Sequence, residues 1–386
     1  MEKKSVAIVV CAWPPQGGGI GNNAYYHAKK LGATEEYEVR VFTPNYGKGK
    51  RIVMEDDFTA EKMPVFLGVG KAGFMLSLFE RLKAFDIIHL YYPFFGTDLV
   101  VLLFKILNPA KKLVLHYEMD PVGEGWKKHF FKIYIKLFFG RIVKWSDKIG
   151  VLSFDHARNS YLSKYLPRHL DKFTELPNGV DTNYFQPGER DAQLAEKFKI
   201  SDNDKVIVFV GGLDDQHYFK GVDILLQSFS KLKSKINHIK LLIIGDGNLK
   251  KKYIQQAHDL NISEDVIFPG WIGNSDLPKY YNLSDIFVLP STARTESFGI
   301  VIAEAQACGL PVVVSNWPGS RETLKDGETG FLVNPGDVHD LTSKIEKLLL
   351  DDDLRKSMGE KGRVRARELY DWDKVTKKII DVYSSL

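Results

Sequence analysis

The sequence predicts an α/β protein made of two doubly wound domains, each built on a parallel sheet. Short runs rich in Val, Ile and Leu alternate with helical patterns from end to end, as in parallel sheets covered on both faces. At 386 residues the chain is too long for one ordinary domain. Its 44% hydrophobic and 26% charged residues are typical of a globular protein that can build two cores.

The first half contains five strand candidates separated by helical stretches. Its opening apolar run stops at Trp13 and Pro14 after only a strand's length, so we interpret it as the first strand and not as a signal peptide. A glycine-rich turn follows, and we expect the next helix to begin near Gly21. The five candidates are Val6–Val10, Glu38–Thr43, Ile87–Tyr91, Leu113–His116 and Lys148–Ser153.

The second half repeats this pattern with five more strand candidates. A polar segment at 183–189 separates the halves, which predicts domains over residues 1–185 and 186–368. The remaining stretch, 369–386, is amphipathic. Ligands of such sheets bind beyond the carboxyl ends of the strands. The second set of candidates is Val206–Val210, Lys240–Ile244, Val266–Phe268, Ile286–Leu289 and Val312–Ser315.

The segment from Glu296 to Glu304 is the strongest candidate for a binding site. It follows a buried strand that ends at Leu289, and it leads into an apolar helix predicted over Ile300–Cys308. Backbone N–H groups at such a helix start can hold a phosphate or sugar oxygen. Glu296 enters this mouth from the loop, and Glu304, two turns inside, can accept two hydroxyls of a ribose. The N–H groups belong to Ser297, Phe298, Gly299 and Ile300.

This arrangement resembles the E-x7-E motif of the retaining GT-B glycosyltransferases of family four. Further motifs in the same order extend the resemblance over nearly the whole chain. They are Gly17, Gly18 and Gly19, His116, Pro177–Asp181, Lys220–Asp223, Gly245–Gly247, Pro318 and Gly319, and Gly327–Gly330. Glycine-rich turns are common in α/β proteins, so the joint order of the motifs carries the resemblance.

The resemblance implies a GT-B fold, with two Rossmann-like domains that face a cleft. Residues 1–185 would bind the acceptor and residues 186–368 the nucleotide sugar, while the helix within 369–386 would cross back onto the N-terminal domain. The family is thought to react on one face of the sugar, with a donor phosphate oxygen taking the acceptor proton. No protein nucleophile is then needed, and catalysis comes from orientation, electrostatic stabilisation and domain closure.

The resemblance also implies which residues form the site. His116 and Glu296 would be catalytic, with Glu296 holding a sugar hydroxyl and His116 contacting the transferred sugar or the acceptor, assisted by Asp120. From the residue alone, a single histidine at a strand end is more often a satisfied core residue. The implied donor-binding residues are Gly19, Gly212, Lys220, Gly245, Ser297, Phe298, Gly299, Ile300 and Glu304.

Lys220 is the best candidate for the cation that stabilises a pyrophosphate leaving group. It precedes a helix just after a strand candidate, where its ammonium can reach phosphate oxygens; otherwise it is an ordinary surface lysine. The chain departs from the family at Gly212, where the family usually has arginine. His217 and Arg294 are candidates to replace that second cation, and His217 is equally well explained as a loop residue.

We expect neither a metal nor a cofactor beyond the substrate, a UDP-, GDP- or similar nucleotide sugar. The chain contains three Asp-x-Asp matches, at 202–204, 351–353 and 371–373. Each lies at a polar helix entry, where aspartate caps the helix or favours its dipole. The positive charge for the leaving group would then come from the protein itself.

Two further segments need an interpretation. The stretch Gly68–Gly73 spells a dinucleotide-binding fingerprint, but it does not follow the first strand, so we interpret it as a loop. Between Trp126 and Lys144, six Lys or Arg and no acidic residues are interleaved with aromatic and aliphatic side chains. This segment either lies in a membrane interface and brings a lipid-linked acceptor to the site, or forms a core helix with a basic solvent face.

Charge and cysteine content limit the remaining choices. The net charge of +4 is mild, so we expect no nucleic-acid partner. Cys11 and Cys308 lie in apolar surroundings, which fits reduced thiols in a cytosolic protein. No window is long and apolar enough to cross a bilayer. We therefore expect a cytoplasmic protein, located at the inner face of the membrane if residues 126–144 bind lipid.

These observations together predict a retaining hexosyltransferase. It would move mannose, glucose or an N-acetylhexosamine from a nucleotide diphosphate sugar to a glycan or lipid-linked acceptor in cell-envelope polysaccharide or glycolipid synthesis. Two alternatives remain. A nucleotide-sugar epimerase of the same fold would need no acceptor, and the missing arginine at Gly212 makes a non-catalytic sugar-nucleotide binder conceivable.

Overall fold

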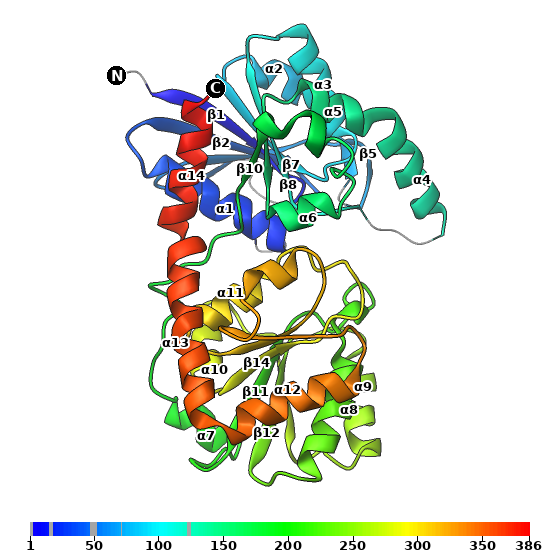
Figure 1. Ribbon diagram of the computed structural model, residues 1–386. Helices are drawn as coiled ribbons and strands as arrows, with labels where there is room; N and C mark the ends of the chain where they lie inside the picture. The colour runs from blue at the N-terminus through cyan, green and yellow to red at the C-terminus, as the bar shows by residue number, and fades with distance from the viewer. Residues whose placement is uncertain (1–2, 15–17, 47–51, 71, 122–124) are drawn as a thin grey trace. The chain divides into compact units, whose positions relative to one another are not determined.

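The computed structural model describes residues 3–14, 18–46, 52–70, 72–121 and 125–386. The chain divides into two compact units: unit 1 contains Met1–Gly179 and Trp372–Leu386, and unit 2 contains Val180–Asp371. Each unit is an α/β body with its own largely parallel sheet and helices packed around it (Figure 1). The structure therefore confirms the predicted fold class, but it divides the chain at 179 and 371 where the sequence predicted 185 and 368.

The described part of unit 1 forms a sheet of eight strands in the order β10-β9-β8-β7-β1-β2-β4-β3. All neighbours are parallel except β3 and β4. The five predicted strands are present, and the sequence pattern missed three short strands at the sheet's two edges. The strands are β1 Lys4–Val9, β2 Tyr37–Pro44, β3 Ile52–Met54, β4 Thr59–Met63, β7 Ile87–Tyr92, β8 Lys112–Tyr117, β9 Lys148–Val151 and β10 Phe173–Glu175.

The first helix of unit 1 begins earlier than predicted, at Gly18 and not near Gly21. A Cβ atom at Gly21 would lie 2.9 Å from the carbonyl oxygen of Ala12, so glycine lets this helix approach the end of β1. The helices of unit 1 are α1 Gly18–Gly32, α2 Leu78–Leu82, α3 Thr97–Leu107, α4 Trp126–Tyr134, a π-helical segment Ile135–Phe139, α5 Gly140–Trp145, α6 Phe154–Arg158, the 3₁₀ turns Leu166–Arg168 and Leu170–Lys172, and α14 Trp372–Ser384.

The last helix, α14, belongs to unit 1 and packs against α1. Trp372 stacks on Tyr26 of α1 with ring centroids 5.6 Å apart. Val375, Ile379 and Tyr383 are almost fully buried in an apolar cluster that also contains residues of α1 and of one face of the sheet. The apolar stripe of α14 therefore forms part of the core of unit 1.

The fingerprint-like stretch Gly68–Gly73 does not form the loop that we expected. It lies within a small antiparallel hairpin of β5 Phe66–Val69 and β6 Ala72–Phe74. The two glycines nearest its turn are Gly70, with a φ of 60°, and Gly73, with a φ of 156°. The hairpin precedes α2 and is not the turn from the first strand to the first helix, so a dinucleotide-binding role is excluded on topology.

Unit 2 contains a six-stranded parallel sheet in the order β13-β12-β11-β14-β15-β16. All five predicted strands are present, and only β16 was missed. The strands are β11 Lys205–Val210, β12 Ile239–Ile244, β13 Val266–Gly270, β14 Ile286–Leu289, β15 Val312–Ser315 and β16 Gly330–Val333. The helices are α7 Ala192–Lys197, a turn Tyr218–Lys220, α8 Val222–Lys233, α9 Lys250–Asp259, α10 Leu277–Asn282, α11 Ile300–Ala307, a turn Ser320–Thr323, α12 Val338–Leu350 and α13 Asp352–Leu369.

Candidate functional site

The strand order of unit 2 changes direction between β11 and β14. From β11 the chain moves outward through β12 and β13, then returns to place β14 on the other side of β11. Doubly wound sheets bind ligands at this switch point, beyond the carboxyl ends of the strands. The loop after β11 contains Gly212 and Lys220, and the loop after β14 contains Glu296. The topology therefore brings two predicted donor-binding residues, Gly212 and Lys220, and the predicted catalytic residue Glu296 to one place.

Lys220 and Glu296 form an ion pair across the switch point. Lys220 Nζ lies 2.7 Å from Glu296 Oε2, and the two side chains are 12% and 16% exposed. Removal from water strengthens such a pair, and each partner fixes the rotamer of the other. The ammonium retains two further N–H donors and the carboxylate a further oxygen. The pair can therefore bind a phosphate oxygen and a sugar hydroxyl without separating.

Glycines let the loops around this pair approach one another closely. A Cβ atom at Gly245 would lie 1.9 Å from the carbonyl oxygen of Gly211, and one at Gly221 would lie 2.0 Å from that of Pro290. Gly221 also has a φ of 76°, which favours glycine. The predicted donor-binding residue Gly245 thus holds the ends of β11 and β12 together. Its contact with a donor stays a prediction.

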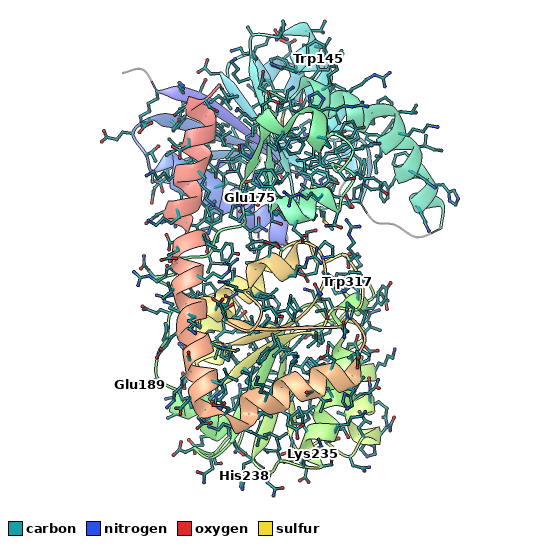
Figure 2. The ribbon with its side chains drawn as sticks, viewed as in Figure 1. Trp145, Glu175, Glu189, Lys235, His238 and Trp317 are labelled. Carbon is teal, nitrogen blue, oxygen red and sulfur yellow. The ribbon has the colours of Figure 1, made fainter. Side chains whose placement is uncertain are left out.

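The loop after β14 is fixed by hydrogen bonds to its neighbours. The backbone N–H of Thr292 donates to the carbonyl of Phe219 at 2.6 Å, which joins the loop to the turn that carries Lys220. Trp317, labelled in Figure 2, follows β15 and donates its indole N–H to the carbonyl of Ser291 at 2.9 Å. Neither Trp317 nor Thr292 lies in a motif, so neither could be predicted as part of the site from the sequence.

Helix α11 begins at Ile300, so Ser297, Phe298 and Gly299 lie directly before its first residue, as predicted. Gly299 has a φ of 74° and makes the sharp entry into the helix. The ring of Phe298 is 5% exposed and packs edge-on against Tyr370, and the carbonyl of Phe298 accepts from Thr323. Phe298 therefore serves the core with its side chain and has only its backbone N–H to offer a ligand.

Glu304 lies one turn further along α11 and is half-buried. Tyr281 donates its hydroxyl to Glu304 Oε2 at 3.0 Å. Burial raises the pKa of Glu304 to about 7, opposed by this hydrogen bond. One carboxylate oxygen thus already accepts from Tyr281, whereas the sequence predicted a carboxylate that accepts two ribose hydroxyls. The contact of Glu304 with a ribose stays a prediction. Tyr281 was missed because its partner lies on another helix.

A histidine occupies the space above Gly212, where the resembled family has arginine. A Cβ atom at Gly212 would lie 2.6 Å from Nδ1 of His217. The same ring nitrogen lies 2.9 Å from a carboxylate oxygen of Asp214. Burial works against the ionised form of Asp214, but the hydrogen bonds from His217 and the Gln216 backbone outweigh it and lower the pKa of Asp214. His217 is therefore tied to a carboxylate, and Gly212 gives it room.

His116, the catalytic candidate of unit 1, lies in a buried network of histidines and tyrosines. Its side chain is 1% exposed, and its ring stacks on Tyr91 with centroids 4.6 Å apart. Its Nδ1 lies 3.0 Å from Nε2 of His89, whose Nδ1 lies 2.7 Å from the hydroxyl of Tyr383. Burial lowers the pKa of His116 to about 4, opposed by the backbone carbonyl of Leu176. The His116 ring is therefore neutral, and its contacts with Tyr91 and His89 fix its orientation.

The remaining candidates of unit 1 lie apart from this network. Gly19 is exposed in the first turn of α1, and Gly17 lies outside the described residues. Asp120 accepts a hydrogen bond from the hydroxyl of Tyr117, which lies on the opposite face of β8 from His116. The structure therefore does not bring Asp120 to the His116 ring.

The basic segment 126–144 combines features of both interpretations of its sequence. One side packs into unit 1, where Phe131 stacks on Phe95 at 4.7 Å and Tyr134 is 7% exposed. The other side exposes Phe130, Ile133 and Leu137, which are 45%, 61% and 49% accessible and follow helical spacing. The exposed basic residues of the segment are Lys128, Lys132, Lys136, Arg141 and Lys144. Among the described residues no helix is long and apolar enough to cross a bilayer.

The Asp-x-Asp matches take structural roles. Asp351 caps α13 by accepting from the backbone N–H of Leu354, Asp204 accepts from Ser201, and Asp371 accepts from Thr182. Within the described ranges no group of three or more His, Cys, Asp or Glu side chains is arranged to hold a metal. The expectation that the reaction needs no metal stays a prediction.

A family model described as glycosyl transferases group 1 matches residues 191–365, which form most of unit 2. Residues 191–365 belong to the glycosyl transferases group 1 family. This confirms the family that the sequence motifs indicated. The matched region contains the switch point, the Lys220–Glu296 pair and both glutamates of the E-x7-E motif.

Two curated relatives and one solved structure illustrate the similarity. The GDP-mannose-dependent alpha-(1-6)-phosphatidylinositol monomannoside mannosyltransferase of Mycolicibacterium smegmatis is 34% identical over 223 residues, covering 56% of this chain and 57% of that protein. The capsular polysaccharide biosynthesis glycosyltransferase CapM of Staphylococcus aureus is 33% identical over 211 residues, covering 54% and 53%. The aligned part of the chain thus spans little more than half the length of these relatives.

The solved structure of Anabaena Alr3699/HepE in complex with UDP matches with a TM-score of 0.77 at 18% identity, covering 99% of this chain and 100% of that one. At this identity the likeness shows the fold alone. It confirms the GT-B architecture that the sequence resemblance predicted.

Proposed function

We propose that the chain is a retaining hexosyltransferase that moves a sugar from a nucleotide diphosphate to a glycan or lipid-linked acceptor. The observation that carries the proposal is the Lys220–Glu296 ion pair, which lies at the switch point of unit 2 and before the start of α11. Its cation and carboxylate match the two ends of a sugar phosphate. The membership of residues 191–365 in a glycosyltransferase family supports it.

In the proposed reaction Lys220 holds the leaving pyrophosphate. The bond between the sugar's anomeric carbon and the phosphate oxygen breaks, and a bond to the acceptor oxygen forms. The acceptor proton passes to the departing phosphate. The ammonium and the N–H groups before α11 stabilise the charge that develops on the pyrophosphate, so the protein itself supplies the positive charge.

Glu296 orients the sugar and Glu304 the ribose. The hydrogen bond from Lys220 fixes the Glu296 carboxylate, so it can accept a hydrogen bond from a hexose hydroxyl without reorganisation. Glu304 has one oxygen bound by Tyr281 and presents the other to a ribose hydroxyl. Orientation by these two acids is the main contribution that the chain makes to the chemistry.

The acceptor belongs to unit 1 in this proposal, and we place a membrane contact on its basic segment. Phe130, Ile133 and Leu137 can enter the headgroup region of a bilayer, while exposed lysines beside them attract anionic lipids. A relative named as a phosphatidylinositol monomannoside mannosyltransferase and another named for capsular polysaccharide synthesis fit a cell-envelope acceptor. This contact would hold the protein at the cytoplasmic face of a membrane.

A donor screen tests the proposed function. The purified chain is incubated with GDP-mannose, UDP-glucose or UDP-N-acetylglucosamine, each with and without a crude lipid or oligosaccharide acceptor, and release of GDP or UDP is measured. We expect release from one donor that rises on adding acceptor, and an α-linked product from an α-linked donor. Release that never depends on acceptor, or a product sugar with inverted configuration, would contradict the proposal. Conversion of a donor into its epimer would favour the alternative enzyme class.

A further inference from the structure

Glu118 lies one residue beyond the carboxyl end of β8, at the edge where parallel sheets bind ligands. Strand residues alternate between the two faces of a sheet, so Glu118 lies on the same face as His116, two residues further toward the carboxyl end of the strand. Its side chain is 4% exposed. His116 was predicted as a site residue from the sequence, whereas Glu118 was not. A carboxylate buried at this position needs an explanation because ionised groups are rarely buried without a partner.

Polar side chains from two other segments reach Glu118. Asn23 of α1 donates its amide N–H to Glu118 Oε1 at 2.7 Å, and the two side chains are both buried. Nε2 of His116 lies 3.7 Å from the same oxygen. Burial raises the pKa of Glu118 to about 7, opposed by hydrogen bonds from Asn23 and Asn178. α1, β8 and the segment after β10 thus converge on one carboxylate.

Two polar atoms in this cluster lack a hydrogen-bond partner within the described residues. They are Nε2 of His116 and Oδ1 of Asn178, whose side chains are 1% and 5% exposed. Buried polar atoms in native proteins are nearly always hydrogen-bonded, so a cluster with two unpaired atoms indicates a missing polar group. A sugar hydroxyl fits, since it can donate its one hydrogen to the carboxylate and accept from a protonated Nε2 of His116, while Oδ1 of Asn178, an acceptor, would take a hydrogen from a second hydroxyl.

The contacts around the His116 ring fix its orientation. Its ring is stacked on Tyr91 at 4.6 Å, and its Nδ1 is bound to His89, which is bound to Tyr383. Only Nε2 faces Glu118. The network therefore fixes the His116 ring with Nε2 directed toward Glu118, and leaves Glu118 as the outermost polar group of the cluster.

We propose that Glu118, supported by Asn178 and Nε2 of His116, binds one hydroxyl of a sugar substrate, with the Glu118 carboxylate accepting the hydroxyl hydrogen. The inference rests on the proposed glycosyltransferase function and adds a carboxylate of unit 1 to its binding residues. The hydroxyl belongs either to the acceptor or to the transferred sugar. Nε2 of His116 contacts the same hydroxyl, and the contacts of the ring with His89 and Tyr91 hold it in position for this.

The test compares Glu118→Gln with a matched control, Asp98→Asn. Asp98 is a second fully buried carboxylate of unit 1, whose pKa burial also raises to about 7, but it lies at the start of α3, where it accepts a hydrogen bond from Tyr134. Both substitutions conserve shape and remove a buried charge. We measure the melting temperature, the dissociation constants of UDP and GDP, and the steady-state release of nucleotide from the donor that the wild-type chain accepts.

We expect Glu118→Gln to lower kcat/KM about 10- to 100-fold, the usual size for loss of a hydrogen bond to a charged group. Nucleotide dissociation constants should stay at wild-type values, since the nucleotide site lies in unit 2. Asp98→Asn should keep wild-type kinetics. If donor hydrolysis without acceptor falls as much as transfer, the hydroxyl is on the transferred sugar. If only transfer falls, it is on the acceptor. Either result supports the proposal.

Three outcomes overturn it. Wild-type kinetics in Glu118→Gln would remove Glu118 from the site while leaving the glycosyltransferase function intact. An equal kinetic loss in both variants, with an equal fall in melting temperature, would mean that Glu118 serves only the fold. A wild-type chain that releases no nucleotide from any donor would overturn the proposed function and this inference together. Should Glu118→Gln fail to fold, Glu118→Asp, which withdraws the carboxylate by one methylene, replaces it, and wild-type rates in that variant overturn the proposal.

Discussion

The carboxyl ends of the strands, where parallel sheets bind ligands, carry an ion pair in unit 2 and a buried polar network in unit 1. In unit 2, Lys220 and Glu296 are 12% and 16% exposed and form an ion pair between two loops. In unit 1, His27, His89, His116 and Glu118 are at most 4% exposed and lie in one buried network. Burial lowers the pKa of His27 to about 3 and of His116 to about 4, and raises that of Glu118 to about 7.

This difference follows from the cost of burying charge. Partly exposed groups that share an ion pair keep their charges, whereas fully buried ones shift toward their neutral forms. Unit 2 therefore presents an ion pair, which suits a phosphate, and unit 1 presents neutral histidines around one buried acid, Glu118, which suit hydroxyls. The proposed division between a donor unit and an acceptor unit agrees with what each edge can do physically.

The largest expected effect is that of Glu296→Ala, which removes the carboxylate from the charged edge. We expect kcat to fall about 10²- to 10³-fold, as for loss of one preorganised electrostatic contact, with the fold preserved. Steady-state nucleotide release measures it. The matched control is Glu346→Ala, because Glu346 pairs with Lys235 (Figure 2) elsewhere in unit 2 at 3.1 Å. Unchanged turnover in Glu296→Ala would remove this residue from the site.

Lys220→Ala should weaken binding of UDP or GDP about 10- to 100-fold, since one charge-assisted hydrogen bond to phosphate is lost. Calorimetry gives the dissociation constant directly. Lys240→Ala serves as the control, because Lys240 forms a similarly shielded ion pair with Asp265 at 2.9 Å, but at the start of β12, on the opposite edge of the sheet. Equal nucleotide affinity in the two variants would contradict the phosphate role of Lys220.

The same contrast explains how far the sequence could predict the site. The charged edge of unit 2 was accessible because its residues lie in short motifs that follow strands, so Lys220 and Glu296 could be named before their contact was known. Most strands with continuous apolar runs were found for the same reason, although β16, Gly330–Val333, was missed. Short edge strands such as β10, Phe173–Glu175, were missed because they lack such a run.

The buried edge of unit 1 could not be predicted in this way. Glu118 meets Asn23 across 95 positions of sequence, and His89 meets Tyr383 across 294. No local pattern reports contacts of this kind, because they depend on how α1, β7, β8 and α14 pack together. His116 was predicted as catalytic because it lies at a strand end, whereas Glu118, two residues later, lies in no recognisable motif. The His217 ring above Gly212 was equally invisible, since glycine gives no sign of what fills its space.

A fall in pH should destabilise unit 1 and stabilise unit 2. The folded pKa values of His27, His89 and His116 lie below the ordinary 6.5, so the stability they contribute is present above pH 6.5 and lost as pH falls. The pKa values of Glu118 and Asp98 are raised to about 7. These two acids therefore bind protons in the folded state between pH 6.5 and 4.5, which offsets the effect of two of the three histidines. The three histidines outnumber the two acids, so a fall in pH should on balance destabilise unit 1.

Unit 2 should respond with the opposite sign. Burial raises the pKa of Glu304 from 4.5 to about 7, so its contribution to stability is full below pH 4.5 and is lost as pH rises toward 7. Hydrogen exchange of β7 and β8 against β14 and α11, at pH 5 and pH 7, measures both units in one experiment. His89→Gln should flatten the response of unit 1, and Glu304→Gln that of unit 2. Parallel responses of the two units in the wild-type chain would contradict the assignment.

The smallest effect concerns the basic segment of unit 1, which gives that unit a surface suited to lipid. Replacing Lys132 and Lys136 by Glu should weaken binding to vesicles that contain phosphatidylserine, by about 1 kcal/mol or more for each lost cation, because each contributes roughly that amount near an anionic surface. Sedimentation with vesicles measures it. Replacing Lys356 and Lys361 of α13 makes the same charge change in unit 2 and should leave binding unchanged. Equal loss in both double variants would mean that total charge, and not the exposed face around Ile133, attracts the membrane.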